Sequence, residues 1–241
     1  MRFLDFDTIA SINVEKFRET KPFPWVNPSN FLTEEGYAEL IKTLPEISYF
    51  DKDFGKPRKY GQKPHDRYRL SYDKKLDFIN TAWHDFVTEL HGQEYQSLIK
   101  KLFNIESFEL RAEWHYAESG GQVTPHLDGP TNYGAQLFYL ITKENWKQEW
   151  GGQTLILGNE KSMFAESNPE ISDFTQVIAA NCVGNNTLIF KNTENAWHSV
   201  KEFTPPSGVH RKIFSIFITK HKGPEPGIGN KLKQLFSFSA Q

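Results

Sequence analysis

The chain has 241 residues, with 28 lysines and arginines against 30 aspartates and glutamates, for a formal net charge of −2. This balance excludes a protein that binds nucleic acid through an overall positive charge. Hydrophobic residues make up 38% and charged residues 24%, which excludes a disordered or collagen-like chain and predicts a globular one, of a length typical of one domain.

The first half of the chain has the periodicity of helices. Thr33 can cap a helix whose apolar stripe ends at Pro45. Asp73 can cap a second helix that runs to about Gly92, and a third apolar stripe occupies residues 95–102. The segment 55–70 between the first two helices is too rich in glycine and proline for regular structure.

From about residue 106 the period changes from 3.6 to 2. Apolar residues alternate with polar ones over 108–116, which is typical of a half-buried strand. Further strands are expected at 123–128, 135–142, 153–157, 187–191, 196–200 and 211–219, separated by glycine- and proline-rich turns. Helices followed by many short strands predict an α+β fold, with the helices packed on a sandwich or barrel. The tail from Lys222 predicts a loop that leads to a short docked segment.

Three polar residues of this β region form a candidate metal site. His126 and Asp128 are two apart on a predicted strand, so both side chains point to the same face. His198, on a distant strand, can complete the set. Two histidines and a carboxylate suit non-haem Fe(II), although zinc hydrolases use the same ligand types. Arg211 opens a strongly apolar strand, where a buried cation requires an anion, and its planar guanidinium suits a carboxylate.

With Tyr116, Tyr139 and the Gly151-Gly152 turn, this pattern resembles the Fe(II)/2-oxoglutarate-dependent dioxygenases, specifically their prolyl-4-hydroxylase-like branch. The resemblance covers roughly residues 106–220. It implies a double-stranded β-helix (jelly-roll) core, with Fe(II) held by His126, Asp128 and His198 and with O2 as co-reactant. It also implies that Arg211 and Tyr139 bind the distal carboxylate of 2-oxoglutarate, and that Tyr116 lines the cosubstrate pocket.

The implied activity is hydroxylation of a C–H bond, with 2-oxoglutarate converted to succinate and CO2. Asp128 argues against halogenation, because family members that halogenate have a small residue at this place. Many prolyl hydroxylases use lysine for the distal carboxylate, and here Arg211 and Lys212 are adjacent. Only one of them can face inward from a strand, and Arg211 is favoured for its geometry and spacing. The expected substrate is a small molecule, an amino acid or peptidyl residue, or an anionic glycan.

The basic segment 55–70 allows two interpretations. It is either a solvated loop or a lid over the iron that recognises an anionic substrate; its cations are Lys56, Arg58, Lys59, Lys63, Arg67 and Arg69. Tyr60 and Tyr68 lie among these cations, as aromatic residues do in nucleic-acid grooves, so an enzyme acting on nucleobases is a weaker variant.

Two other classes of function compete with the oxygenase. A cupin-like or lectin-like jelly roll could use the histidines for a structural metal, but it would not need a buried Arg211. A zinc hydrolase would need a general-base carboxylate beside the metal, and the sequence has no HExxH motif.

The remaining polar residues are assigned no ligand role. His115 lies on the polar side of its strand and is expected at the surface or at a cap, and His65 lies in a loop without a partner at ligand spacing. Cys182 is the single cysteine, so disulfides within the chain and multi-cysteine zinc sites are excluded and a reducing cytoplasm is expected. Acidic residues near the N-terminus disfavour a signal peptide, and no apolar run is long enough for a membrane span.

We expect one domain over 1–241, with helical support at about 30–104, the core at about 106–220 and a tail at 221–241.

Overall fold

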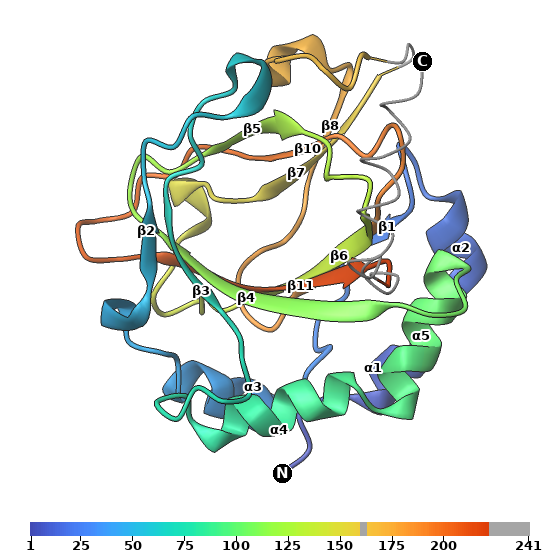
Figure 1. Cartoon of the computed structure of the whole chain (residues 1–241), viewed down its shortest axis with the longest axis vertical. Coiled ribbons are helices and arrows are strands. Elements are labelled where there is room, and N and C mark those ends of the chain that lie inside the picture. The colour runs from blue at the N-terminus through green and yellow to red at the C-terminus, as the bar shows by residue number, and fades with distance from the viewer. Residues whose placement is uncertain (160–162, 222–241) are drawn as a thin grey trace, which may run out of the picture.

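Two antiparallel sheets form the framework of the computed structural model, which describes residues 1–159 and 163–221 (Figure 1). The larger sheet has the strand order β1-β9-β6-β11-β4-β3-β2, and the smaller has the order β5-β10-β7-β8. The strands are β1 (Trp25–Val26), β2 (Asp51–Asp53), β3 (Arg67–Ser71), β4 (Glu109–Ala117), β5 (Val123–His126), β6 (Asn132–Tyr139), β7 (Thr154–Gly158), β8 (Gln176–Ala179), β9 (Thr187–Lys191), β10 (His198–Val200) and β11 (Arg211–Thr219).

Helices cover the outer face of the larger sheet, below β4 and β11 in Figure 1. The α-helices are α1 (Phe6–Ser11), α2 (Val14–Glu19), α3 (Glu34–Lys42), α4 (Thr81–Leu90) and α5 (Gln93–Phe103). Short 3-10 helices lie at Ile47–Tyr49, Lys59–Gly61, Gln148–Trp150 and Ile171–Asp173. No helix in the described ranges is long and apolar enough to cross a membrane.

The central strand β11 shows why both faces of the larger sheet are buried. Phe214, Ile216 and Ile218 point to the helices and join the core between helices and sheet. Ile213, one residue out of phase, joins the second core, between the two sheets. Side chains alternate between the faces of a strand, so one strand contributes to both cores.

The predicted helices are confirmed, with one corrected boundary. Thr33 caps α3 by accepting a hydrogen bond from the backbone N–H of Gly36 (3.0 Å). The cap of α4, however, is Asn80, which accepts from Ala82 N (2.9 Å). Asp73 instead accepts from Lys75 N (2.9 Å) within a turn, so the second helix begins later than expected. Both residues are good caps, and the sequence alone does not rank them.

The predicted strands are also found, and the structure adds others. The segment 55–70 is not wholly irregular, because its end belongs to β3, which pairs with β4. β1, β2 and β8 and the two helices before residue 30 were not expected either. All are six residues or shorter, and such short elements carry little periodic signal. The expected docked segment after Lys222 lies outside the described residues.

Candidate metal and cosubstrate site

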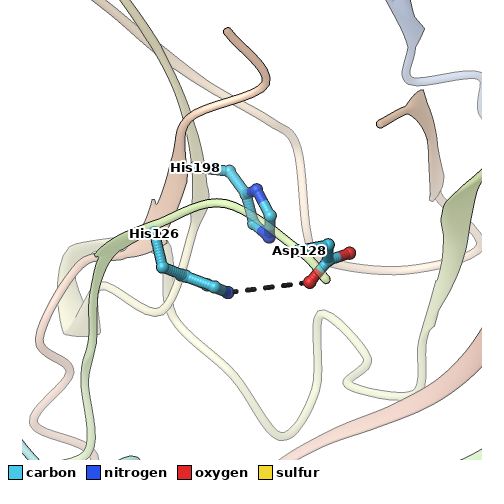
Figure 2. Close-up of side chains that lie close together, drawn as sticks. All are labelled: His126, Asp128 and His198. Atoms are coloured by element: carbon cyan, nitrogen blue, oxygen red, sulfur yellow. Dashed lines mark ion pairs between the residues drawn. The ribbon is translucent and has the colours of Figure 1, made fainter. Parts of the chain in front are cut away.

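The three predicted metal ligands converge between the two sheets. β10 pairs with β5 so that His198 lies directly opposite His126, although 72 residues separate them in the sequence. Their ring centroids are 4.3 Å apart. Asp128 lies just beyond the end of β5 and turns back toward the two rings (Figure 2). One ligand atom from each of the three residues lies within 4.8 Å of the others, and His126 Nε2 is 4.0 Å from Asp128 Oδ1.

Backbone carbonyls fix the tautomers of both histidines. His126 Nδ1 donates to Thr124 O (3.0 Å), and His198 Nδ1 donates to Ala196 O (2.9 Å). Because a carbonyl only accepts, each Nδ1 carries a proton, and Nε2 is the ring atom left for a metal. Burial, and then the neighbouring His198, lowers the pKa of His126 well below its usual range, so this ring is neutral. Two imidazoles and a carboxylate are the donor set of non-haem Fe(II) sites, so the residues present fit that ion.

The position of Asp128 is fixed from β9. The side-chain amide of Asn192, which follows this strand, donates to Gly129 O (3.1 Å) and to Asp128 O (3.4 Å). The loop after β5 is therefore tied to the larger sheet, while His126 and His198 belong to the smaller one. The relative positions of the three ligands thus depend on how the two sheets pack against each other.

Arg211 is buried beside this site in a polar cage. Its Nε donates to Gly152 O (2.7 Å) and its Nη2 to Thr154 Oγ1 (3.3 Å). The Tyr139 hydroxyl donates to the same Thr154 oxygen (2.9 Å). Gly152 has φ +80°, and a Cβ there would come within 3.2 Å of Arg211 Cδ. Glycine therefore lets the backbone approach the guanidinium, which explains the glycine at position 152. Thr154 belongs to this cluster but was not predicted.

The structure separates Arg211 from Lys212 and corrects the position of Tyr116. In the pairing of β11 with β4, Lys212 lies opposite Tyr116, and its Nζ is 5.1 Å from the ring centroid. Both face the helices, and the Tyr116 hydroxyl donates to Pro45 O (3.2 Å). Tyr116 is thus part of the core under the sheet and does not line the pocket, contrary to the expectation from the sequence. On the other face of β11, Ile213, Ser215 and Phe217 line the cavity between the sheets, and Arg211 lines the hollow beside it.

A cavity of about 430 Å³ extends over the three ligands between the sheets. A smaller hollow of about 80 Å³ adjoins it and has Arg211 in its wall. The two share His65, Arg67 and His115 among their lining residues. The volume lies in the range of small-molecule sites.

Two histidines that the sequence left unassigned lie in this cavity. His65 is buried, its ring centroid is 5.2 Å from that of His126, and Nε2 is 3.4 Å from Thr124 Oγ1. Burial, followed by the charges of Arg58 and Arg67, lowers the pKa of His65 to about 3. The only sequence signal for His65 was the basic segment around it.

His115 is also buried, which corrects the expectation of a surface residue. Its Nε2 is 3.0 Å from Glu113 Oε2, and Nδ1 is 3.4 Å from Ser215 Oγ. Burial lowers its pKa to about 4 despite the Glu113 hydrogen bond, so the ring is neutral near pH 7. The polar side of the strand faces the cavity, and the apolar side faces the helices.

Comparison with known proteins agrees with this geometry. The family profile "2OG-Fe(II) oxygenase superfamily" matches residues 113–219. A prolyl-4-hydroxylase from Pseudomonas putida has a similar structure (TM-score 0.61, 13% identity, 89% of this chain and 100% of that one). So does a Trichoplax adhaerens prolyl hydroxylase in complex with a hypoxia inducible factor peptide (TM-score 0.62, 15% identity, 98% of this chain and 93% of that one).

A third similar structure is HygX from Streptomyces hygroscopicus with nickel, 2-oxoglutarate and hygromycin B bound (TM-score 0.60, 11% identity, 89% of this chain and 90% of that one). No curated protein sequence matches the chain. The similarity in fold confirms the predicted α+β class with a jelly-roll core. Residues 113–219 thus match the model of the 2OG-Fe(II) oxygenase superfamily, whose members use Fe(II), 2-oxoglutarate and O2.

Proposed function

We propose that the protein hydroxylates a C–H bond of a small molecule or of a single peptidyl residue, with conversion of 2-oxoglutarate to succinate and CO2. The observation that carries this proposal is the convergence of the His126 and His198 rings and the Asp128 carboxylate beside a buried, hydrogen-bonded Arg211. A jelly roll with a merely structural metal would gain nothing from a guanidinium buried next to the metal, because burial of a cation is costly.

In this proposal each residue of the site has one task. His126, Asp128 and His198 hold Fe(II) on one side, and the bound metal and cosubstrate supply the oxidising power. The Arg211 guanidinium receives the distal carboxylate of 2-oxoglutarate through two parallel hydrogen bonds, for which its fork is shaped. Thr154 holds the Arg211 fork and the Tyr139 hydroxyl together. Apolar side chains in the wall, such as Leu137 and Phe190, would limit the access of water to the reacting C–H bond.

The substrate class follows from the cavity. Its volume of about 430 Å³ has to accommodate the cosubstrate as well, which leaves room for a small molecule or one side chain of a peptide. Similar structures include a prolyl hydroxylase in complex with a peptide fragment and HygX with hygromycin B bound. Several arginines in the wall favour an anionic substrate.

The domain boundaries and the compartment belong to the same proposal. We assign residues 1–241 to one oxygenase domain, because the helices and the larger sheet share one core in the described part of the chain. We assign the protein to the reducing cytoplasm, because its single cysteine, Cys182, is buried and free.

Succinate release tests the proposal. The purified protein with Fe(II), ascorbate, 2-oxoglutarate and O2 is screened against amino acids, peptides and anionic sugars, and we expect succinate to rise with a true substrate. Asp128→Ala should abolish this release and keep the wild-type circular dichroism spectrum, because the core does not depend on the metal. Loss of folding in Asp128→Ala would indicate a structural metal, and wild-type release in that variant would refute the assignment.

A further inference from the structure

Four arginines reach the wall of the larger cavity: Arg58, Arg67, Arg69 and Arg111. Two of them already have carboxylate partners. Arg69 Nε lies 2.8 Å from Asp53 Oδ2, and Arg111 forms an ion pair with Glu113 while its guanidinium stacks 4.1 Å from the Phe217 ring centroid. These two arginines are therefore neutralised by the protein itself.

Arg58 and Arg67 differ from that pair. Among residues 1–159 and 163–221, neither has a carboxylate within ion-pair distance. The Nε of Arg67 is buried without any hydrogen-bond partner there, and Arg58 Nε donates only to the neutral Gln62 Oε1 (3.3 Å). Glu113 and Asp53 near Arg67, and Asp128 near Arg58, act on these charges only from beyond ion-pair distance. A partly buried guanidinium that contacts no anion lowers stability, so its presence indicates a ligand that supplies the contact.

Both side chains lie where a substrate would lie. Arg67, on β3, lines the large cavity and also the hollow next to Arg211. His65, two residues before it, lines both as well, and its ring centroid lies 5.2 Å from that of His126. Arg58 is carried by the segment before β3, and Gln62 of that segment donates to Pro125 O (3.4 Å), next to His126. The other cations of this segment, Lys56, Lys59 and Lys63, are exposed and do not line the cavity.

We propose that Arg67 and Arg58 together bind an acidic group, a carboxylate or a phosphate, of the primary substrate. This inference rests on the proposed oxygenase function and specifies its substrate as a small acid held by two guanidinium groups. Arginine binds both anions through paired N–H groups, so the shared chemistry is an oxoanion with two acceptor oxygens. Arg58 and Arg67 are thus the cations of the basic segment that reach the cavity without an ion-pair partner among the described residues, while its lysines remain at the surface.

The first test needs no ligand. Arg67→Gln should unfold at the same temperature as the wild type or at a higher one, because no protein partner is lost. Arg69→Gln should unfold at a lower temperature, because Asp53 and Glu113 each lose one of their ion-pair partners. A clear drop in the melting temperature for Arg67→Gln would mean that Arg67 stabilises the fold, and the inference would be wrong.

The second test compares acids with their neutral analogues. Protein loaded with Mn(II) and 2-oxoglutarate is screened by thermal shift against pairs of small carboxylic acids and their primary amides, and of phosphate monoesters and their alcohols. We expect at least one acid to stabilise the protein where its neutral partner does not. Affinity for that acid should fall about 10- to 100-fold in Arg67→Gln and in Arg58→Gln, as expected for a lost charged hydrogen bond. Lys63→Gln, in the same segment, should bind like the wild type.

The third measurement separates this inference from the proposed function. Calorimetric titration with 2-oxoglutarate in the presence of Mn(II) should give the wild-type affinity for Arg67→Gln and a strongly reduced one for Arg211→Gln. Loss of 2-oxoglutarate binding in Arg67→Gln would assign Arg67 to the cosubstrate and overturn the inference while the oxygenase proposal stands. Failure of the wild type to bind 2-oxoglutarate would overturn the proposed function itself. Preference for neutral analogues, or stabilisation only by a single-stranded oligonucleotide, would refute a small acidic substrate.

Discussion

Arg211 and Lys212 are adjacent cations with opposite surroundings, because neighbouring residues of a strand point to opposite faces. Arg211 is 6% exposed and donates to Gly152 O and Thr154 Oγ1. Lys212 lies over Tyr116 on the helix side of the sheet. The face of the strand to which each side chain points, and not the type of charge, therefore decides which cation can contact a ligand in the cavity.

Replacing each cation by alanine tests this assignment of the two side chains to opposite faces. We expect Arg211→Ala to weaken binding of 2-oxoglutarate about 10-fold or more, because a charged hydrogen-bonded pair contributes roughly 1.5–3 kcal/mol. Lys212→Ala should bind 2-oxoglutarate within about 2-fold of the wild type. Calorimetry with Mn(II) measures both affinities. An equal or larger loss in Lys212→Ala would mean that the strand faces the other way.

Thr154 offers a second test at the scale of one atom. Its hydroxyl oxygen accepts from both Tyr139 and Arg211, so Thr154→Val removes the acceptor with little change in shape. The buried Tyr139 hydroxyl would lose its partner, and we expect the free energy of unfolding to fall by about 1–3 kcal/mol. Urea denaturation measures this loss, and the affinity for 2-oxoglutarate should fall as well. Unchanged stability and affinity would show that the cage does not depend on Thr154.

At the scale of the element, strand β4 has two buried faces of different chemistry. Trp114 and Tyr116 face the helices, while Glu113 and His115 face the cavity between the sheets. The alternation in the sequence correctly indicated a strand. It did not show that the polar side was also covered, because the second sheet that covers it comes from distant parts of the chain.

The buried His115 should make stability depend on pH. Its folded-state pKa of about 4 lies below the ordinary 6.5, because burial disfavours the charged ring. The unfolded chain therefore binds the proton first, and the stability present above pH 6.5 is lost as the pH falls toward 4. Between pH 7 and pH 4.5 the free energy of unfolding, measured with urea, should fall less in His115→Gln than in the wild type. The two decreases should differ by at most about 3 kcal/mol. The exposed residue His91 provides the control, since His91→Gln should keep the wild-type difference. An identical pH dependence in His115→Gln would contradict the burial of this ring.

Close packing of strand β6 gives a prediction on the fold. A Cβ at Gly134 would meet the carbonyl oxygen of Phe190 on β9 and would come within 2.8 Å of the Phe103 ring of α5. Gly134→Ala should therefore push a strand and a helix away together and destabilise the protein by about 1–3 kcal/mol. Gly129→Ala, where a Cβ has no neighbour within 4 Å, should stay within about 0.5 kcal/mol. Thermal unfolding measures both, and equal melting temperatures would contradict the packing.

At the scale of the whole molecule, the sequence predicted the elements and site residues that follow from local spacing. It missed the features that depend on contacts between distant segments. The helices α3 and α5, the long strands and the His126–Asp128 pair each follow from a pattern within about ten residues. The identity of His198 as the third residue of the cluster also agrees with the structure, where β10 pairs with β5.

The misplacement of Tyr116 and the burial of His65 have one cause. Which side of β4 faces the helices, and which loop covers the cavity, are decided by contacts between residues far apart in the chain. Tyr116 binds Pro45 O, 71 residues away, and His65 approaches Thr124 Oγ1, 59 residues away. No pattern within one segment contains that information.

The central claim is that His126, Asp128 and His198 hold Fe(II) next to a pocket for 2-oxoglutarate, and anaerobic optical titration tests it most directly. Addition of 2-oxoglutarate to the Fe(II)-loaded protein under nitrogen should produce a weak visible charge-transfer band that saturates at one equivalent per chain. The band should be absent in His198→Ala that retains its fold by circular dichroism. A wild-type protein that gives no band and no binding, or a band that survives in His198→Ala, would contradict the account.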